Sequence, residues 1–178
     1  MATQRIVLIG GPGTGKSTLL NAIEEKGFIC FEEVSRQVTK AAQEEGIEQL
    51  FLTEPLLFSQ KLLEQRIIQY QKAEELQEDF VFIDRGIPDV VAYLDYVGQN
   101  YPADFIQACE RYKYDQIFVL PPWEEIHETD GERYESFEQA QAIQEVLLHN
   151  YVKYGYAPIE VPKMTVEQRV SFVLDKLS

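Results

Sequence analysis

The residues with the clearest chemical signature form one segment, Gly10-Gly11-Pro12-Gly13-Thr14-Gly15-Lys16-Ser17. It fits the pattern G-x-x-x-x-G-K-[ST], in which glycines allow backbone N–H groups to converge on phosphate oxygens. In this pattern Lys16 reaches the outer phosphates and the Ser17 hydroxyl ligates Mg²⁺. The segment therefore predicts a site for ATP or GTP with Mg²⁺. The predicted nucleotide-binding residues are Gly11, Pro12, Gly13, Thr14, Gly15, Lys16, Ser17 and Thr18.

A second signal, the acidic residue Asp84, follows the apolar run at residues 80–83 and stands at the expected end of a buried strand. An aspartate in this position is typical of a magnesium ligand that acts directly or through water, and Asp84 is predicted to be one. The alternative is a carboxylate that caps the next helix. Arg85 comes directly after Asp84 and is expected to face the gap between nucleotide and acceptor. A surface salt bridge is an equally open interpretation of Arg85.

A third signal, Glu33 and Arg36, comes after the apolar run at residues 28–31. Residues three apart share a helix face, and a helix is expected over residues 32–45. Glu33 is a candidate general base for an acceptor hydroxyl, and Arg36 a candidate ligand for an acceptor phosphate or carboxylate. An intrahelical ion pair between the two is the competing explanation.

The fourth signal is a polar loop at residues 123–135, which contains Arg133 as the only lysine or arginine between Lys113 and Lys153. A lone arginine in a loop that faces the phosphates is a candidate transition-state clamp. The neighbouring acids could instead form a solvated face to which Arg133 is paired. His127 and His149 match no metal-ligand spacing.

The elements that must position these residues alternate along the chain. Short apolar runs predict strands at residues 6–9, 28–31, 80–83, 116–120 and 158–161. Helical patterns are expected at residues 15–26, 32–45, 55–76, 89–97, 103–112 and 136–154, and in a last helix capped by Thr165. Ser136 opens one of these helices, with Glu138 near a capping-box position. The alternation predicts an α/β fold with three layers, in which helices cover both faces of a five-stranded parallel sheet. Ligands of such sheets bind at the carboxyl ends of the strands, and each signal above follows a strand.

Length and composition set the remaining limits. The 178 residues suit one domain over residues 1–178, and the net charge of −14 disfavours nucleic acid as a partner. No apolar run approaches the ~20 residues of a membrane span, and no signal peptide is evident. Cys30 and Cys109 are expected to be reduced, so a cytoplasmic location is predicted.

Together these motifs resemble a small family of AAA-type predicted ATPases. The family includes the nicotinamide riboside kinase domain of the bacterial NAD regulator and an insect protein linked to channel translocation. The resemblance is carried by Gly10 to Ser17, Glu33-x-x-Arg36, Phe82-Ile83-Asp84, Tyr112-x-x-Asp115, Asp130-Gly131-x-Arg133 and Val161-Pro162. It implies a P-loop fold like that of nucleoside monophosphate kinases, a lid at about residues 123–135, and phosphoryl transfer from ATP or GTP. The Arg85-Gly86 pair is a departure from the riboside kinase domain and resembles nucleoside and nucleotide kinases instead.

Two functions follow as hypotheses. The first is a small-molecule kinase with a nucleoside, nucleotide or related metabolite as acceptor. Its catalytic residues would be Lys16, Glu33, Asp84, Arg85 and Arg133, its acceptor-binding residues Glu33, Arg36 and Arg85, and its metal ligands Ser17 and Asp84. The second is a nucleotide-binding switch or slow NTPase that signals to a protein or phosphoinositide. A ring-forming motor is disfavoured because the chain has no room for a helical subdomain. The choice between ATP and GTP, the acceptor and the oligomeric state stay open at this stage.

Overall fold

Five parallel strands form one sheet in the computed structural model, which describes residues 2–11, 13–126 and 136–178. The strands are β1 (Gln4–Ile9), β2 (Ile29–Phe31), β3 (Phe80–Asp84), β4 (Gln116–Val119) and β5 (Ile159–Glu160). Their order across the sheet is β2-β3-β1-β4-β5, and every neighbouring pair is parallel. The predicted five-stranded parallel sheet is confirmed.

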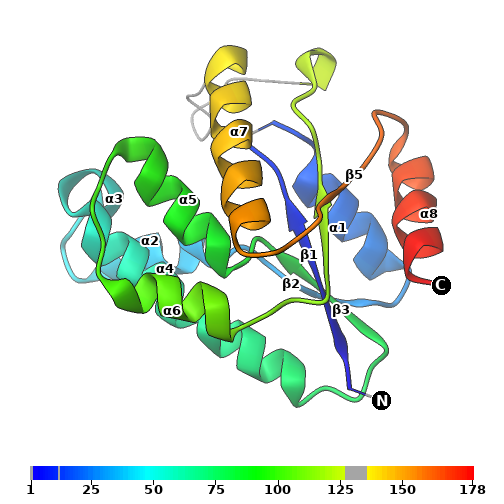
Figure 1. Ribbon diagram of the computed structural model, residues 1–178, viewed down its shortest axis with the longest axis horizontal. Coiled ribbons are helices and arrows are strands. Elements are labelled where there is room, and N and C mark those ends of the chain that lie inside the picture. Colours follow the sequence, from blue (N-terminus) through cyan, green and yellow to red (C-terminus); the bar gives the residue numbers. More distant parts are fainter. Residues whose placement is uncertain (1, 12, 127–135) are drawn as a thin grey trace.

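The helices are α1 (Lys16–Glu25), α2 (Ser35–Glu44), α3 (Leu50–Thr53), α4 (Pro55–Glu74), α5 (Ile87–Val97), α6 (Ala103–Arg111), α7 (Phe137–Lys153) and α8 (Val166–Leu177). A 3₁₀ turn, η1 (Glu124–Ile126), follows β4. Figure 1 shows α1 and α8 on one face of the sheet, with α4, α5, α6 and α7 on the other. Among the described residues, no helix is both long enough and apolar enough to cross a membrane.

Two hydrophobic cores lie on the two faces, and β1 contributes to both. Ile6 and Leu8 pack in the core beneath α1 and α8, whereas Val7 and Ile9 pack in the larger core beneath the other helices. All four side chains are fully buried. Because successive strand residues point to opposite faces, a strand buried on both sides must be apolar at every position. This explains why an unbroken apolar run, without alternation, becomes the central strand.

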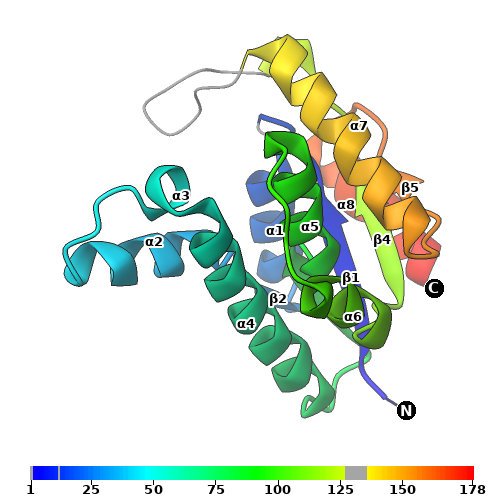
Figure 2. The same ribbon diagram turned by 60° about the vertical axis from the view of Figure 1, so that its left-hand side comes forward.

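The structure corrects several expected boundaries. The helix expected from residue 32 begins at Ser35, so Glu33 precedes it and shares no helix face with Arg36. The helix expected from residue 89 begins at Ile87, because Pro88 fits the first turn of a helix. The capping box at Ser136 is closed by Gln139, not Glu138. The short helix α3 was not predicted, and Figure 2 shows it with α2 beside the upper end of α4, away from the sheet.

The strand order fixes what lies along the carboxyl edge of the sheet, which is uppermost in Figure 1. The glycine-rich loop follows the central strand β1. Asp84 ends β3 on one side of it, and Glu33 follows β2 one strand further out. The segments after β4 and β5 lie on the opposite side. Residues far apart in the sequence thereby reach one edge in a defined order.

Candidate functional site

The glycine-rich loop after β1 has the backbone that its sequence requires. Gly13 and Gly15 adopt φ values of 73° and 83°, in the left-handed region that favours glycine. A Cβ atom at Gly10 would lie 2.8 Å from Thr14 Oγ1 and 2.9 Å from the carbonyl oxygen of Leu120. The Thr14 hydroxyl also donates a hydrogen bond of 3.1 Å to the Gly11 carbonyl. The loop is therefore a tight turn in which side chains at the glycines would not fit.

Helix α1 begins directly at the end of this loop. Gly15 is its N-cap residue and, lacking a side chain, leaves the first amide groups of the helix without a side-chain cap. Ser17 and Thr18 lie exposed in the first turn. The amide groups and the positive end of the helix dipole make this position favourable for an anion such as a phosphate. The start of α1 could therefore hold an anion, and the placement of the nucleotide phosphates there stays a prediction.

Lys16 is buried beside Asp84. Its side chain is only 9% exposed, and its ammonium group forms an ion pair with the Asp84 carboxylate at the end of β3. Burial, together with the Arg85 guanidinium, lowers the pKa of Lys16 below its ordinary value, although Asp84 and Glu33 act in the opposite direction. Two of the predicted residues thus meet across neighbouring strands.

The donor chemistry at this position fits Mg²⁺. The Asp84 carboxylate and the Ser17 hydroxyl are hard oxygen ligands, and Mg²⁺ is commonly held by one or two such groups plus phosphate oxygens. Asp84 already binds a cation in this structure, the ammonium of Lys16. Within the described part of the chain, no cluster of three or more histidine, cysteine or acidic side chains could hold a metal by itself. A Mg²⁺ ion here would take its remaining ligands from phosphate oxygens and water.

Glu33 is the centre of a second group of charges, one strand further along the edge. Its Oε2 atom lies 2.7 Å from Arg85 Nε, and its Oε1 atom lies 2.9 Å from Arg66 Nη2. The Ser35 amide, at the start of α2, donates to Oε1 at 3.1 Å. Burial by itself would raise the pKa of Glu33, but the charges of Arg66, Arg85 and Lys16 outweigh it and lower the pKa to about 2. Glu33 is consequently a carboxylate held ionised by its neighbours.

Arg85 has an unusual backbone. Its φ of 68° makes it the only non-glycine residue of the described chain in the left-handed region, while its amide still bonds the Leu8 carbonyl at 3.0 Å. Such a conformation costs of order 1 kcal/mol and concentrates at functional sites. It turns the chain sharply at the end of β3 and places the guanidinium against Glu33. About a third of the Arg85 side chain stays exposed, at 31%.

Arg66 is a member of this group that the sequence interpretation missed. It is 4% exposed on α4, and its Nη1 atom donates a 2.9 Å hydrogen bond to the Gly86 carbonyl. Burial acts against the charged form, but Glu33 raises the pKa of Arg66 above its ordinary value. The sequence did contain a signal that could have pointed to Arg66. Leu62, Arg66 and Tyr70 follow one another at four-residue spacing on the buried face of α4, so a charge interrupts an apolar stripe.

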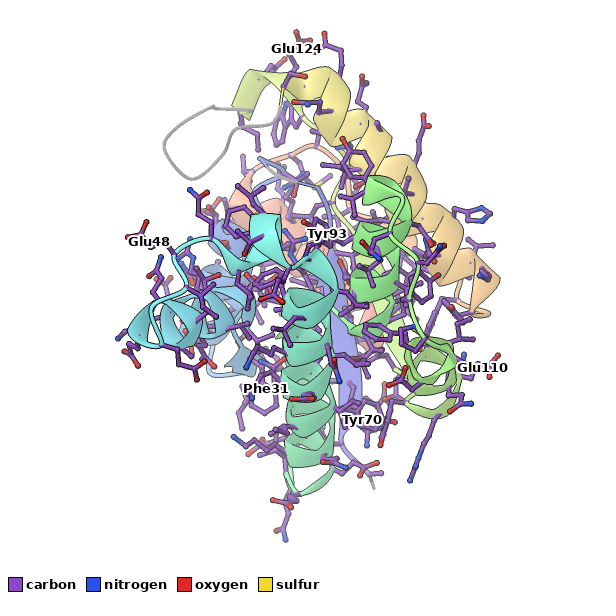
Figure 3. The ribbon with its side chains drawn as sticks, turned by 90° about the vertical axis from the view of Figure 1, so that its left-hand side faces the viewer. Phe31, Glu48, Tyr70, Tyr93, Glu110 and Glu124 are labelled. Atoms are coloured by element: carbon purple, nitrogen blue, oxygen red, sulfur yellow. The ribbon has the colours of Figure 1, made fainter. Side chains whose placement is uncertain are left out.

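A buried network supports the turn after Arg85. Asp89 accepts a 2.9 Å hydrogen bond from the Gly86 amide and another from the Tyr151 hydroxyl of α7. A Cβ atom at Gly86 would lie 2.7 Å from the Tyr151 hydroxyl oxygen, so only glycine fits there. Half-buried Tyr93, on the same helix as Asp89, lies beside the upper end of α4 in Figure 3. The hydrogen bonds of Asp89 hold α7 against the start of α5 beside the Glu33 group.

The other predicted site residues are placed as follows. Arg36 is exposed in the first turn of α2. Pro12 and Arg133 lie outside the described residues, as does most of the loop at 123–135. The structure therefore brings together Lys16, Asp84, Arg85 and Glu33, and it leaves the placement of the lid arginine as a prediction.

A family model described as an AAA domain matches residues 5–169. The chain belongs to this family. No curated protein matches it by sequence.

Solved structures of kinases share its fold. A deoxyadenosine kinase from M. mycoides matches with a TM-score of 0.71 and 17% identity, covering 98% of both chains. A thymidylate kinase from Candida albicans matches with a TM-score of 0.72 and 19% identity, covering 99% of this chain and 91% of that one. NadR in complex with NR matches with a TM-score of 0.71 and 16% identity, covering 97% of this chain and 49% of that one. The fold is that of P-loop nucleoside and nucleotide kinases.

Proposed function

We propose that this chain is a magnesium-dependent P-loop phosphotransferase that moves the terminal phosphoryl group of ATP or GTP to a hydroxyl of a small-molecule acceptor. The observation that carries the proposal is the adjacency of two charge centres on one sheet edge. The pair of Lys16 and Asp84 stands at the phosphate loop, and the pair of Glu33 and Arg85 stands one strand away. That the same fold serves deoxyadenosine and thymidylate kinases supports this assignment.

On the donor side, the chain's own residues bind the phosphates and neutralise their charge. Amide groups at the start of α1 hold the phosphates, and Lys16 reaches the terminal phosphoryl group after exchanging Asp84 for it. Ser17 and Asp84 would hold Mg²⁺, which would supply positive charge to neutralise the outer phosphates. Arg133 would complete the neutralisation from the lid. Catalysis of this kind needs positioned charge more than covalent chemistry.

On the acceptor side, we assign Glu33 and Arg85 to the reacting hydroxyl. The Glu33 carboxylate would accept a hydrogen bond from that hydroxyl, and Arg85 would donate to its oxygen. Because its pKa is about 2, Glu33 acts chiefly by orienting the hydroxyl, with the proton leaving late in a loose transition state. Arg36 would bind a phosphate or carboxylate group of the acceptor.

The test is an acceptor screen with γ-labelled ATP and GTP over nucleosides, nucleotides, sugars and vitamins, with Mg²⁺ present. We expect a labelled product from at least one acceptor class, and loss of that product with Glu33→Gln or Lys16→Met. A slow release of labelled phosphate that needs no acceptor, with no labelled product, would instead support the nucleotide-binding switch. Glu32→Gln is the matched control, because Glu32 is the exposed neighbour of Glu33.

A further inference from the structure

Arg169 is a buried arginine from the last helix that contacts the phosphate loop. It lies on α8, is 3% exposed, and belongs to none of the motifs above. Its Nη1 atom donates a 3.0 Å hydrogen bond to the Thr14 carbonyl, and its Nε atom donates a 3.0 Å bond to the Pro162 carbonyl after β5. Its guanidinium also lies 5.0 Å from the centre of the Trp123 ring, after β4. One side chain thus joins three loops at the carboxyl edge.

Arg169 has no ionic partner among the described residues. Within the same residues, 2–11, 13–126 and 136–178, its Nη2 atom is buried without a hydrogen-bond partner. Burial lowers the pKa of Arg169 below the ordinary value for arginine. A buried, unpaired cation is unfavourable unless an anion approaches it. In a protein of net charge −14, this position beside the phosphate loop is therefore informative.

The hydrogen bond to Thr14 also has a geometric consequence. In a planar trans peptide the carbonyl and the following N–H point in opposite directions. Arg169 donates to the Thr14 carbonyl, so the N–H of the next residue, Gly15, points in the direction opposite to that carbonyl. Gly15 is close to the guanidinium, since a Cβ atom built on it would lie 3.1 Å from Nη1. Without this bond, glycine would let the peptide rotate and turn a carbonyl toward the phosphates.

We propose that Arg169 is a positioning residue that locks the Thr14–Gly15 peptide in its phosphate-binding orientation and adds a positive charge behind the bound phosphates. The proposal rests on the function proposed above only in requiring a polyphosphate at this loop. It assigns to the C-terminal helix a direct part in nucleotide affinity. A hydrogen bond from a charged donor corresponds to roughly a 10- to 100-fold effect on affinity.

The experiment measures binding of inorganic tripolyphosphate and of ATP, each with Mg²⁺, by calorimetry to wild type and Arg169→Met. We expect both ligands to bind at least about tenfold more weakly to the variant. Lys176→Met is the control, because it removes an exposed charge from the same helix and should change affinity less than twofold. Arg169→Lys keeps the charge but not the planar fork that reaches two carbonyls, and should bind with intermediate affinity.

A second readout separates positioning from general stability. In ¹⁵N-labelled wild type, saturating tripolyphosphate should shift the Gly15 amide resonance strongly, and in Arg169→Met the shift should be smaller even at saturation. The proposal would be overturned if the Gly15 amide shifted equally in Arg169→Met and wild type, and if the variant bound both ligands within twofold of the wild-type affinity. If Arg169→Met does not fold, as judged by circular dichroism, Arg169→Lys replaces it in both measurements. For that variant we expect both ligands to bind at least about fivefold more weakly than to wild type, with a smaller shift of the Gly15 amide resonance. If wild type itself binds neither ligand, the proposed nucleotide-binding function fails as well.

Discussion

The low pKa of Glu33 can be tested by replacing it with glutamine and measuring stability against pH. The side chain is only 17% exposed, and it pairs with both Arg66 and Arg85. Its pKa is about 2 in the folded protein, against an ordinary value of 4.5. A carboxyl whose folded-state pKa is depressed contributes stability above its unfolded pKa, and that stability is lost as the pH falls toward the folded pKa. The informative window is therefore between pH 4.5 and pH 2.

The contribution of Glu33 to the free energy of unfolding follows from the shift in its pKa. A difference of 2.5 pKa units, from 4.5 to about 2, corresponds to about 3 kcal/mol at neutral pH at about 1.4 kcal/mol per unit. The same linkage relation gives a loss of about 2 kcal/mol of this contribution by pH 3. Glu33→Gln cannot titrate, so it lacks this part of the pH dependence. The gap in unfolding free energy between wild type and the variant should narrow by about 2 kcal/mol between pH 6 and pH 3.

The assay is urea denaturation of wild type, Glu33→Gln and Glu32→Gln at several pH values, followed by circular dichroism. Taking the difference from wild type removes the acid sensitivity of the many other carboxylates. The exposed control Glu32→Gln should follow wild type across the range. A gap for Glu33→Gln that stays constant within about 0.5 kcal/mol from pH 6 to pH 3 would refute the ion-pair reasoning, because the linkage relation requires the larger change.

Three further predictions concern the same edge of the sheet. Asp84→Asn should leave Lys16 without its ionic partner and lower Mg²⁺-dependent phosphoryl transfer by about a hundredfold or more, measured with γ-labelled ATP; an unchanged Mg²⁺ dependence would contradict the ligand role. Arg133→Ala should lower the same rate more than about tenfold, and a smaller fall would rule out the lid clamp. Gly86→Ala should destabilise the fold by about 1–3 kcal/mol in urea, because the new Cβ would meet the Tyr151 hydroxyl oxygen at 2.7 Å. Combining it with Tyr151→Phe should restore part of the loss, and no recovery would mean that the hydroxyl is not the obstacle.

Much of the candidate nucleotide side of the site could be located from the sequence, because its signals are local. The loop from Gly10 to Ser17 carries its own backbone requirement, and the left-handed φ values of Gly13 and Gly15 are what that spacing demands. Asp84 was likewise predictable, since it ends an apolar run that had to be a buried strand. The alternation of apolar runs and helical patterns was enough to predict the parallel sheet.

The partners of these residues depended on the tertiary structure. Glu33 pairs with Arg66, 33 positions away, and Thr14 binds Arg169, 155 positions away. Local periodicity indicates which face of an element is buried, but not which other element covers it. The buried arginine on α4 interrupts an apolar stripe and could have been noticed, but its partner could not have been named.

By itself, then, the sequence determined the glycine-rich loop, the sheet that presents it and the aspartate that ends β3, because each is encoded in neighbouring residues. Only the tertiary structure decided the environment of Glu33, the strained turn at Arg85 and the link from Arg169 to the loop. The physical reason is the strand order β2-β3-β1-β4-β5. It places β3 between β1 and β2, so that Glu33 faces Arg85, and it places β4 and β5 on the far side, where α8 can reach the loop.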